Sequence, residues 1–415
     1  MTSFENDAGR GPEWLPEERL CIGCGLCVSL SGSGRMIESP TGWLVPRFDD
    51  CEPILAGDGR ALVEAVCPSH TMTLSQDAPA PSGSPRERVW GRSLETVRSW
   101  ATDDSVRHGG ASGGVLTAIA GHLLESGAIS SVIHVAPTAH VGRARSTTST
   151  SLKELVAGNG SWYCPSPALE GLLPSSERPR AVIAKPCEVS ATRRLRERRP
   201  DLVDPGDILL SFFCGGLPSR SATFELAESV GAKPAEVDQF RYRGEGWPGD
   251  TRFDGPSGSW RVGYETSWGQ HLGREIHPLC KICPDSIGLA ADVVVGDAWI
   301  IDGGAPTFVD RPGESVVMVR SAIGRRVYEG AKRAGVVADR SFAIDELGLS
   351  QALHYERRRL GLARRIGARL GGLGVPRAGR LGLRAASTCS PALFLRNLVG
   401  SARRAHHRNR RRVPG

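Results

Sequence analysis

The stretch CIGCGLC, residues 21–27, decides how the N-terminal part of this 415-residue chain is expected to fold. Three thiols at C-x2-C-x2-C spacing can surround one [4Fe–4S] cluster, and the glycines between them let the backbone turn tightly around the sulfur atoms. Bacterial ferredoxins add a ligand from a distant Cys-Pro pair, which in this region is Cys67-Pro68. The sequence therefore predicts a small ferredoxin-like [4Fe–4S] domain, whose predicted ligands are Cys21, Cys24, Cys27 and Cys67.

A structural zinc site is the alternative for these four thiols, because four cysteines also suit zinc. Zinc knuckles use paired C-x2-C groups, whereas the C-x2-C-x2-C triplet is typical of iron–sulfur proteins, so a cluster is favoured. The region has no second complete motif, which predicts one cluster here. Cys51 is left over and is interpreted as a spare buried thiol.

Composition divides the chain into parts. From residue 357 onward there are sixteen Arg and no Asp or Glu, so removing these sixteen charges from the net +7 leaves −9 for residues 1–356. A Pro/Ser/Gly run, APAPSGSP at residues 78–85, is typical of a linker. The predicted parts are an N-terminal lead-in (1–20), the iron–sulfur domain (21–77), a larger cofactor-binding domain (86–350) and a basic C-terminal extension (357–415).

After the linker, short apolar runs alternate with helical periodicity, which predicts a mixed α/β domain. A helix is expected over residues 113–126, ended by Gly127. Strands are expected at residues 129–135, 181–184, 207–213, 292–295 and 316–319. Lys185, Cys214 and Asp297 follow three of these strands, and ligands gather at the carboxyl edge of such sheets, so the three residues are expected to converge on one site.

A second group of cysteines is dispersed in the sequence. Two of them follow predicted strands and two form a C-x2-C pair, which together would suffice for another cluster. The alternative is that they are small hydrophobic residues of the core. The members are Cys187, Cys214, Cys280 and Cys283. Cys164 and Cys389 have no partner by spacing and are expected to be inert.

Together these residues resemble the coenzyme F420 hydrogenase/dehydrogenase beta-subunit family, which is similar to 7-hydroxymethyl chlorophyll a reductases. The resemblance covers roughly residues 18–320 and lies in seven ordered blocks. The blocks are CIGCGLC, SGGVLTAI (112–119), GSWY (160–163), AKPCEVSATR (184–193), FFCGG (212–216), YRGEGWPG (242–249) and CKICPDSIGLAADVVVGDAW (280–299). The sequence departs from the family pattern at Trp162, where a lysine is expected, and in the basic tail.

The resemblance implies a bound FAD, one or two [4Fe–4S] clusters and coenzyme F420 as co-substrate. The chain would then be an oxidoreductase that moves electrons between F420 or ferredoxin and a partner protein or small substrate. Two alternatives stay open, namely a ferredoxin-dependent reductase of a specific metabolite without F420, and a non-catalytic electron-transfer subunit. No Ser/His/Asp set, paired carboxylates or H-x-x-x-H motif stands out, so the chemistry is assigned to cofactors and no catalytic side chain is named.

The glycine-rich turn HGGASGG, residues 108–114, opens the predicted helix, and such a turn presents amide groups and a helix dipole to a phosphate. This suits the FAD pyrophosphate, with hydroxyl donors at Ser112 and Thr117. An N-cap with close packing is the alternative. The candidate cofactor contacts are Ser112, Gly113, Gly114, Thr117, Ser161, Lys185, Arg243, Gly244, Trp247 and Asp297.

The remaining candidates have their own alternatives. Lys185 would stabilise an anionic flavin or bind phosphate, unless it is a solvated lysine. Arg243, Gly244 and Trp247 combine a cation, a flexible backbone and a large ring suited to an anionic planar cofactor, although Trp247 could merely anchor a loop. Asp297 would accept a ribityl or ribose hydroxyl, or cap the next segment.

The N-terminus lacks the features of an export signal and no run of eighteen apolar residues exists, so a cytoplasmic location is expected. The basic tail is expected to be a solvated or partly disordered extension, or else to dock on an acidic partner or an anionic membrane surface. Nucleic-acid binding has no fold signature. Deleting residues 357–415 is expected to leave flavin and iron content unchanged and to reduce such association.

Overall fold

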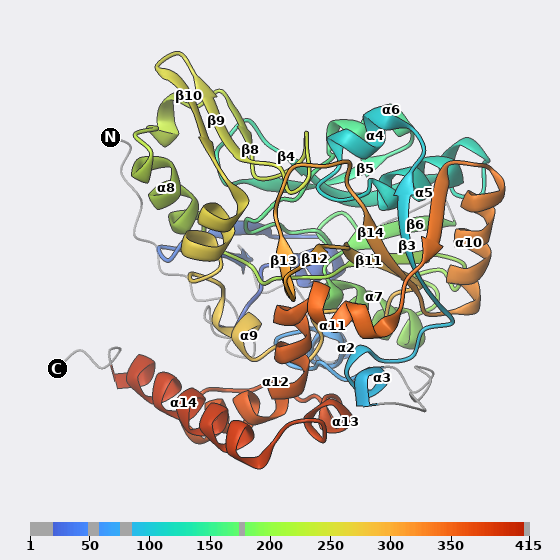
Figure 1. The fold of residues 1–415 in the computed structure, drawn as a ribbon. Coiled ribbons are helices and arrows are strands. Elements are labelled where there is room, and N and C mark those ends of the chain that lie inside the picture. Colours follow the sequence, from blue (N-terminus) through green and yellow to red (C-terminus); the bar gives the residue numbers. More distant parts are fainter. Residues whose placement is uncertain (1–19, 49–57, 75–84, 174–178, 411–415) are drawn as a thin grey trace.

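The computed structural model describes residues 20–48, 58–74, 85–173 and 179–410 (Figure 1). Cys51 and residues 1–19 of the predicted lead-in lie outside these ranges. Within them, no helix is both long and apolar enough to cross a membrane.

An eight-stranded mixed sheet forms the centre of the molecule, in the order β15-β3-β14-β11-β7-β6-β4-β5. The strands β4, β6, β7 and β11 run parallel to one another, and the outer pairs are antiparallel. The bounds are β3 (Glu95–Ala101), β4 (Ser131–Pro137), β5 (Ala144–Ser149), β6 (Arg180–Ala184), β7 (Ile208–Phe212), β11 (Val293–Asp297), β14 (Ser315–Val319) and β15 (Val337–Ser341).

The five strands expected from the sequence are all present, each within two residues of its expected bounds, which confirms the mixed α/β class. Most of their Val, Ile and Leu residues are buried, on both faces, as strands at the centre of a sheet require. The other three strands, β3, β5 and β15, were not expected. Their sequences, such as ARSTTS in β5, contain too many polar residues for an apolar run to be seen.

Helices cover both faces of the sheet (Figure 1). On one face, α5 (Val115–Glu125) and α10 (Ala322–Arg333) pack Ile119, Leu123 and Tyr328 against the strands. On the other, α7 (Pro186–Arg198) contributes Val189 and Leu195. The helix expected over residues 113–126 is thus confirmed, and Gly127 follows its end with φ 70°, a left-handed conformation that favours glycine.

Smaller elements surround this sheet. A second sheet contains β8 (Gln239–Arg241), β9 (Thr251–Gly255) and β10 (Gly258–Val262), and two hairpins are β1 (Arg35–Glu38) with β2 (Leu44–Arg47) and β12 (Ile300–Asp302) with β13 (Ala305–Thr307). The remaining helices are α1 (Leu26–Ser31), α2 (Asp58–Val66), α3 (Pro85–Trp90), α4 (Asp104–Gly109), α6 (Leu152–Ala157), α8 (Arg220–Ser229), η2 (Pro234–Glu236), η3 (Glu265–Leu272), α9 (Pro278–Lys281), α11 (Ile344–Ser350), α12 (Ala352–Leu370), α13 (Leu383–Ala386) and α14 (Pro391–Arg410).

The cysteine-rich N-terminal region shares a hydrophobic core with the rest of the chain. Ile22 and Val66 belong to the same buried cluster as Leu169, Leu279 and Ala378. The predicted domain boundaries, and a ferredoxin-like fold for residues 21–77, stay predictions.

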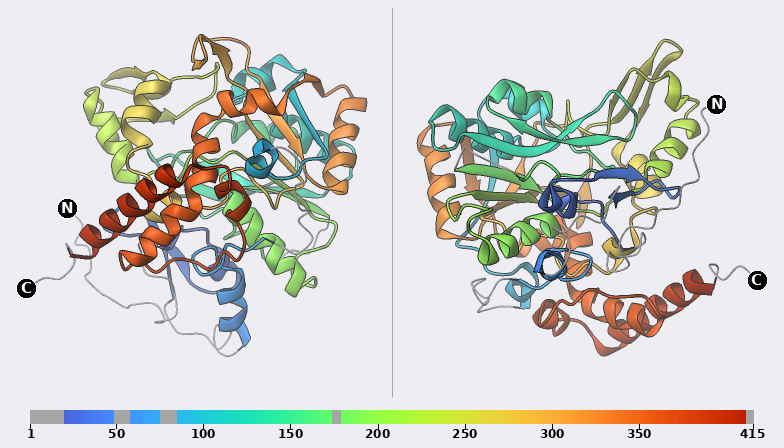
Figure 2. Two further views of the ribbon diagram at one scale, coloured as in Figure 1. Left: turned by 60° about the horizontal axis from the view of Figure 1, so that its bottom comes forward. Right: turned by 180° about the vertical axis from the view of Figure 1, so that it is seen from behind.

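The basic C-terminal region is folded as far as it is described. Residue 357, where the extension was expected to begin, lies within α12, and both Arg358 and Leu360 are buried. Helix α14 packs along α12, and the two helices form a layer beside the N-terminal segment (Figure 2). The expectation of a solvated or partly disordered extension is therefore wrong for residues 357–410, because apolar residues at helical spacing, among them Leu360, Ala363 and Ala368, are buried.

The α12–α14 contact depends on glycine. A Cβ atom added at Gly367 would stand 2.1 Å from the carbonyl oxygen of Leu398, which belongs to the backbone of α14 and cannot move alone. We expect Gly367→Ala to lower the free energy of unfolding by about 1–3 kcal/mol, as overpacking does. The matched control is Gly348→Ala in α11, where a Cβ meets nothing within 4 Å and alanine favours the helix. Urea unfolding of both variants checks this, and equal effects would contradict it.

Candidate functional site

Four thiols from the N-terminal region line one small, mainly apolar cavity. Gly23 (φ 65°) and Gly25 (φ 80°) both adopt the left-handed conformation, so the tight turn expected between the thiols is present. Burial and then the neighbouring thiolates raise the pKa of both Cys24 and Cys27. The members of this first thiol set are Cys21, Cys24, Cys27 and Cys67.

The four dispersed cysteines also come together, and we call them the second thiol set. Its members are Cys187 at the start of α7, Cys214 after β7, Cys280 in α9 and Cys283 just beyond it. Burial first, and then the charge of Cys214, raises the pKa of Cys280 to about 12. Cys187 likewise interacts electrostatically with Cys283 and Cys214. The structure thus supports the expected convergence of these thiols, whereas their role as ligands stays a prediction.

The metal that these two sets would hold stays a prediction. Among the described residues, no three Cys, His, Asp or Glu side chains are placed to hold a single metal ion. Burial makes thiolates costly here, so a strongly positive group is needed before these thiols can lose their protons.

Helix α7 links the two thiol sets. Cys187 lies in its first turn, and the buried guanidinium of Arg194, two turns later, donates to the carbonyl of Val66 at 2.7 Å, directly before Cys67. Burial lowers the pKa of Arg194 to about 10, while the charges of Cys67 and Cys187 act in the opposite direction. Arg194 therefore interacts electrostatically with one thiol of each set.

Helix α12 covers the second thiol set. Arg357 donates to the carbonyl of Cys214 at 3.5 Å, and Arg358 donates to the carbonyls of Val89 and Pro284. Arg358 also interacts electrostatically with Cys283. The structure therefore does not support the expectation that deleting residues 357–415 leaves the iron content unchanged, because the deletion removes side chains that pack on this set.

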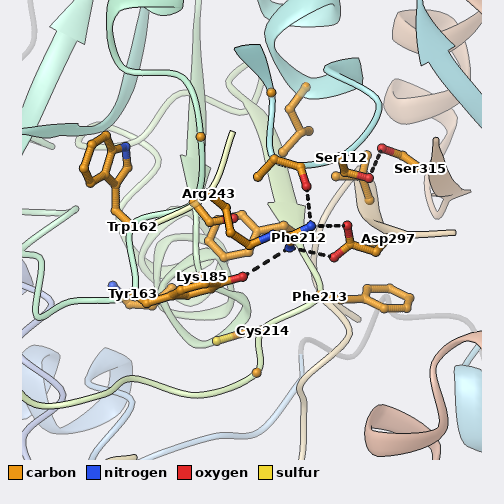
Figure 3. Close-up of a pocket in the computed structure, with 18 of the residues that line it drawn as sticks. Ser112, Trp162, Tyr163, Lys185, Phe212, Phe213, Cys214, Arg243, Asp297 and Ser315 are labelled. Atoms are coloured by element: carbon orange, nitrogen blue, oxygen red, sulfur yellow. Dashed lines mark hydrogen bonds and ion pairs between the residues drawn. The ribbon is translucent and has the colours of Figure 1, made fainter. Parts of the chain in front are cut away.

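A cavity of about 520 Å³ opens at the carboxyl ends of β6, β7 and β11. Lys185, Cys214 and Asp297 all line it, so the expected convergence of these three residues is found (Figure 3). Its volume is in the range of small-molecule and cofactor sites. Cys214 belongs both to this cavity wall and to the second thiol set.

The N-terminus of α5 faces the cavity without a side-chain cap. Gly114 is the N-cap residue, with φ 69°, and Val115 and Thr117 in the first turn of the helix line the cavity. The first amides of a helix have no partner within the helix. Beside them, Thr117 donates to Asn159 at 2.7 Å, and the buried Nδ2 of Asn159 has no hydrogen-bond partner in the described structure. This wall therefore offers several unused donors, which suits an anionic or oxygen-rich ligand.

The other residues of the glycine-rich turn hold the backbone in place. The Ser112 hydroxyl, although it lines the cavity, lies 2.9 Å from that of Ser315 and donates to the carbonyl of Glu314 at 3.0 Å. A Cβ at Gly113 would approach the carbonyl oxygen of Ser99 to 2.8 Å. Gly113 thus serves close packing, which was the alternative stated for this turn.

Arg243 uses all five of its N–H donors within the protein, and Figure 3 shows those to Asp297 and Tyr163. It forms a bidentate pair with Asp297, at 3.0 and 2.8 Å, and donates to the Tyr163 hydroxyl at 3.2 Å. The remaining two donors bond the carbonyls of Pro248 and Ala111. Its pKa is raised because Asp297 outweighs the effect of burial. The guanidinium therefore positions four segments of the cavity wall, and a direct cofactor contact stays a prediction.

The loop after Arg243 buttresses the same wall. The indole of Trp247 donates to Asp297 at 2.8 Å and stacks on Trp299, with ring centroids 4.9 Å apart. A Cβ at Gly244 would approach the carbonyl oxygen of Gly109 to 2.7 Å. Trp247 therefore anchors the loop, and Asp297 already accepts from two side chains.

Lys185 is buried and lies between the cavity and the second thiol set. Its ammonium group contacts Glu188 at 2.7 Å and donates to the Ser166 hydroxyl at 3.0 Å. Burial disfavours the charge, but Glu188 and the thiolate of Cys187 outweigh burial and raise the pKa of Lys185. The alternative of a solvated lysine is wrong, because its side chain is only 10% exposed.

Ser161 lines the cavity as well, and so do residues that the sequence did not single out. They form an aromatic wall and a polar corner between α11 and α12. Tyr163 and Trp299 lie in quoted sequence blocks and could have been noticed there, but nothing in the sequence indicates the others. These residues are Tyr163, Tyr264, Trp268, Trp299 and Phe308 in the wall, and Ser350, Gln351 and His354 in the corner.

The burial of His354 predicts that the stability of the fold depends on pH. Burial, and then Arg357, lowers its pKa to about 3, whereas an unfolded histidine titrates near about 6.5. Below about pH 6.5 this imidazole binds a proton in the unfolded chain but not in the folded chain. The free energy of unfolding therefore falls by up to about 1.4 kcal/mol per pH unit. We expect His354→Gln to reduce this loss between about pH 6 and pH 4. Urea unfolding across this range checks it, and an unchanged slope would contradict it.

Two family models identify the family of this chain. The family model for the N-terminal part of the coenzyme F420 hydrogenase/dehydrogenase beta subunit matches residues 96–172, and the model for its C-terminal part matches residues 178–343. An uncharacterized protein of Methanocaldococcus jannaschii is 22% identical over 338 residues, which cover 75% of this chain and 87% of the relative. A chain of the F420-reducing [NiFe] hydrogenase complex from Methanosarcina barkeri is 18% identical, with a TM-score of 0.49, covering 65% of this chain and 94% of that one.

Proposed function

Because this chain belongs to the coenzyme F420 hydrogenase/dehydrogenase beta-subunit family, we propose that it transfers electrons between coenzyme F420 and a redox partner through FAD and two [4Fe–4S] clusters. The family supports an oxidoreductase role in general. The observation that carries the specific proposal is the position of Cys214, which lies in the wall of the large cavity and in the second thiol set. A group bound in that cavity would lie beside a cluster held by the second thiol set.

The cavity residues fit FAD. The uncapped N-terminus of α5 and the free Nδ2 of Asn159 would bind the pyrophosphate, with Thr117 holding Asn159 in place. The wall of Tyr163, Trp268 and neighbouring rings would contact the isoalloxazine. Lys185 would stabilise negative charge on the reduced flavin, because its ammonium group is fixed beside the cavity by Glu188.

The thiol sets fit two clusters, with Cys21, Cys24, Cys27 and Cys67 holding one and Cys187, Cys214, Cys280 and Cys283 the other. Flavin supplies the exchange between two-electron hydride chemistry and single-electron transfer, and the clusters carry single electrons. The protein contributes fixed positive charge near both sets. Arg194 lies between them, and Arg357 adjoins the second.

Anaerobic purification tests this proposal. Two clusters and one flavin predict about eight iron atoms, about eight sulfide ions and one FAD per chain. Mixing with reduced F420 should bleach the flavin absorbance. Flavin and iron without bleaching would remove F420 and favour a ferredoxin-dependent reductase, and bleaching that needs a second protein would favour a non-catalytic electron-transfer role. Colourless protein that contains zinc would overturn the proposal.

A further inference from the structure

The C-terminal helices present a strongly basic surface. Residues 357–415 contain no Asp or Glu, and seven of their arginines are exposed in the described structure. The members of this basic face are Arg369, Arg377, Arg380, Arg384, Arg396, Arg403 and Arg404. Residues 350–410 also lie beyond the segments that match the family models, which end at residue 343.

The basic face adjoins the first thiol set. Thr71 forms a β-bridge with Arg377, and the amide of Arg377 donates to the carbonyl of His70 at 2.9 Å. His70 in turn bonds the carbonyl of Cys67. The segment after α12 is therefore fastened to the residues that follow Cys67-Pro68. In the left view of Figure 2, α12, α13 and α14 lie next to the N-terminal segment.

The charge distribution of the chain would orient an approaching partner. Residues 1–356 carry a net charge of −9 when the sixteen tail arginines are taken from the total of +7. A negatively charged partner is repelled by the body and attracted by the tail, so its approach is directed to one side. That side includes the first thiol set, which is the end of the proposed relay away from the cavity.

Exposed apolar side chains lie among the arginines. Leu370 is 71% exposed and Leu383 is 46% exposed. Arginine and apolar groups together are typical of protein interfaces. We propose that an acidic electron-carrier protein docks on this basic face beside the first thiol set, an assignment of the partner that rests on the proposed function.

A membrane surface fits the same helices less well. Interfacial helices need a continuous apolar face. On α14, exposed Leu395 and Val399 lie one turn apart, but the next exposed positions on that line are Arg403 and His406. Two apolar side chains followed by Arg403 and His406 form only a short apolar patch, which suits a protein contact better than insertion among lipids.

The test measures how a plant-type [2Fe–2S] ferredoxin, an acidic one-electron carrier, binds to the full-length holoprotein by calorimetry. We expect Arg377→Glu with Arg380→Glu to weaken binding by about tenfold or more at low salt, and roughly 0.5 M salt to weaken wild-type binding similarly. The matched control is Arg325→Glu with Arg326→Glu. These exposed arginines of α10 lie on a distant part of the molecule, and the net charge changes equally.

Equal weakening by the two pairs would overturn the docking surface, because net charge alone would then explain the binding. Unchanged ferredoxin affinity together with lost binding to phosphatidylserine vesicles would overturn it in favour of a membrane surface. Electron transfer from reduced F420 to benzyl viologen, a small cationic dye, is measured in parallel. Its absence in wild-type protein that still binds ferredoxin would refute the proposed function and leave the docking surface standing.

Discussion

Cys214→Ser is expected to halve the iron and sulfide content of anaerobically purified protein, from about eight to about four atoms of each per chain. The physical reason is that serine keeps the size of the side chain but replaces the soft thiolate that an iron–sulfur cluster needs. The first thiol set does not include this residue and should keep its cluster. Electron transfer from the flavin to an external acceptor should fall by more than about tenfold, because Cys214 is the thiol that lines the cavity.

The matched control for this prediction is Cys164→Ser. Cys164 is only 1% exposed and its pKa is raised to about 12 by burial, yet it belongs to neither thiol set. This variant should retain full iron, sulfide and flavin content. Iron content that is the same in Cys214→Ser as in the wild type would contradict the second cluster, and equal losses in both variants would indicate a general effect of removing buried thiols.

Arg243→Gln is expected to lower the free energy of unfolding by about 3–5 kcal/mol, since it leaves the carboxylate of Asp297 without its buried partner. Arg243 is only 3% exposed, and its five donors join the turn at Ala111, the ring of Tyr163, the loop at Pro248 and the end of β11. Flavin content should therefore also fall. Urea unfolding and FAD content measure the two effects.

A double variant separates these effects. Adding Asp297→Asn to Arg243→Gln removes both charges, so most of the lost stability should return. Flavin content should recover in part, since uncharged partners can still close the wall. The control is Arg241→Gln, which removes bonds of 3.3 and 3.4 Å to the carbonyls of Gly109 and Asn159 and a 3.6 Å ion pair with the exposed Glu245. If the double variant is no more stable than Arg243→Gln, the ion pair is not the source of the stability.

The central strands could be predicted because burial on both faces demands short apolar runs, such as Ile-Leu-Leu in β7 and Val-Val-Val in β11. Polar strands such as β5 could not, because they are recognisable only by their pairing with a neighbour. The same distinction holds for the tail. Its helical periodicity is visible in the sequence, but the contact of Gly367 with the backbone of Leu398 exists only once both helices are packed.

The candidate site divides in the same way. The sequence by itself determined which groups are candidates, because thiol spacing in CIGCGLC and the residues that end three buried strands follow from local rules of ligation and sheet geometry. Only the tertiary structure decided which groups meet. It showed that Arg243 is saturated by acceptors from distant segments, that Asn159 keeps a free donor, and that the basic tail folds against both thiol sets. Such pairings depend on long-range packing, which no local pattern of residues encodes.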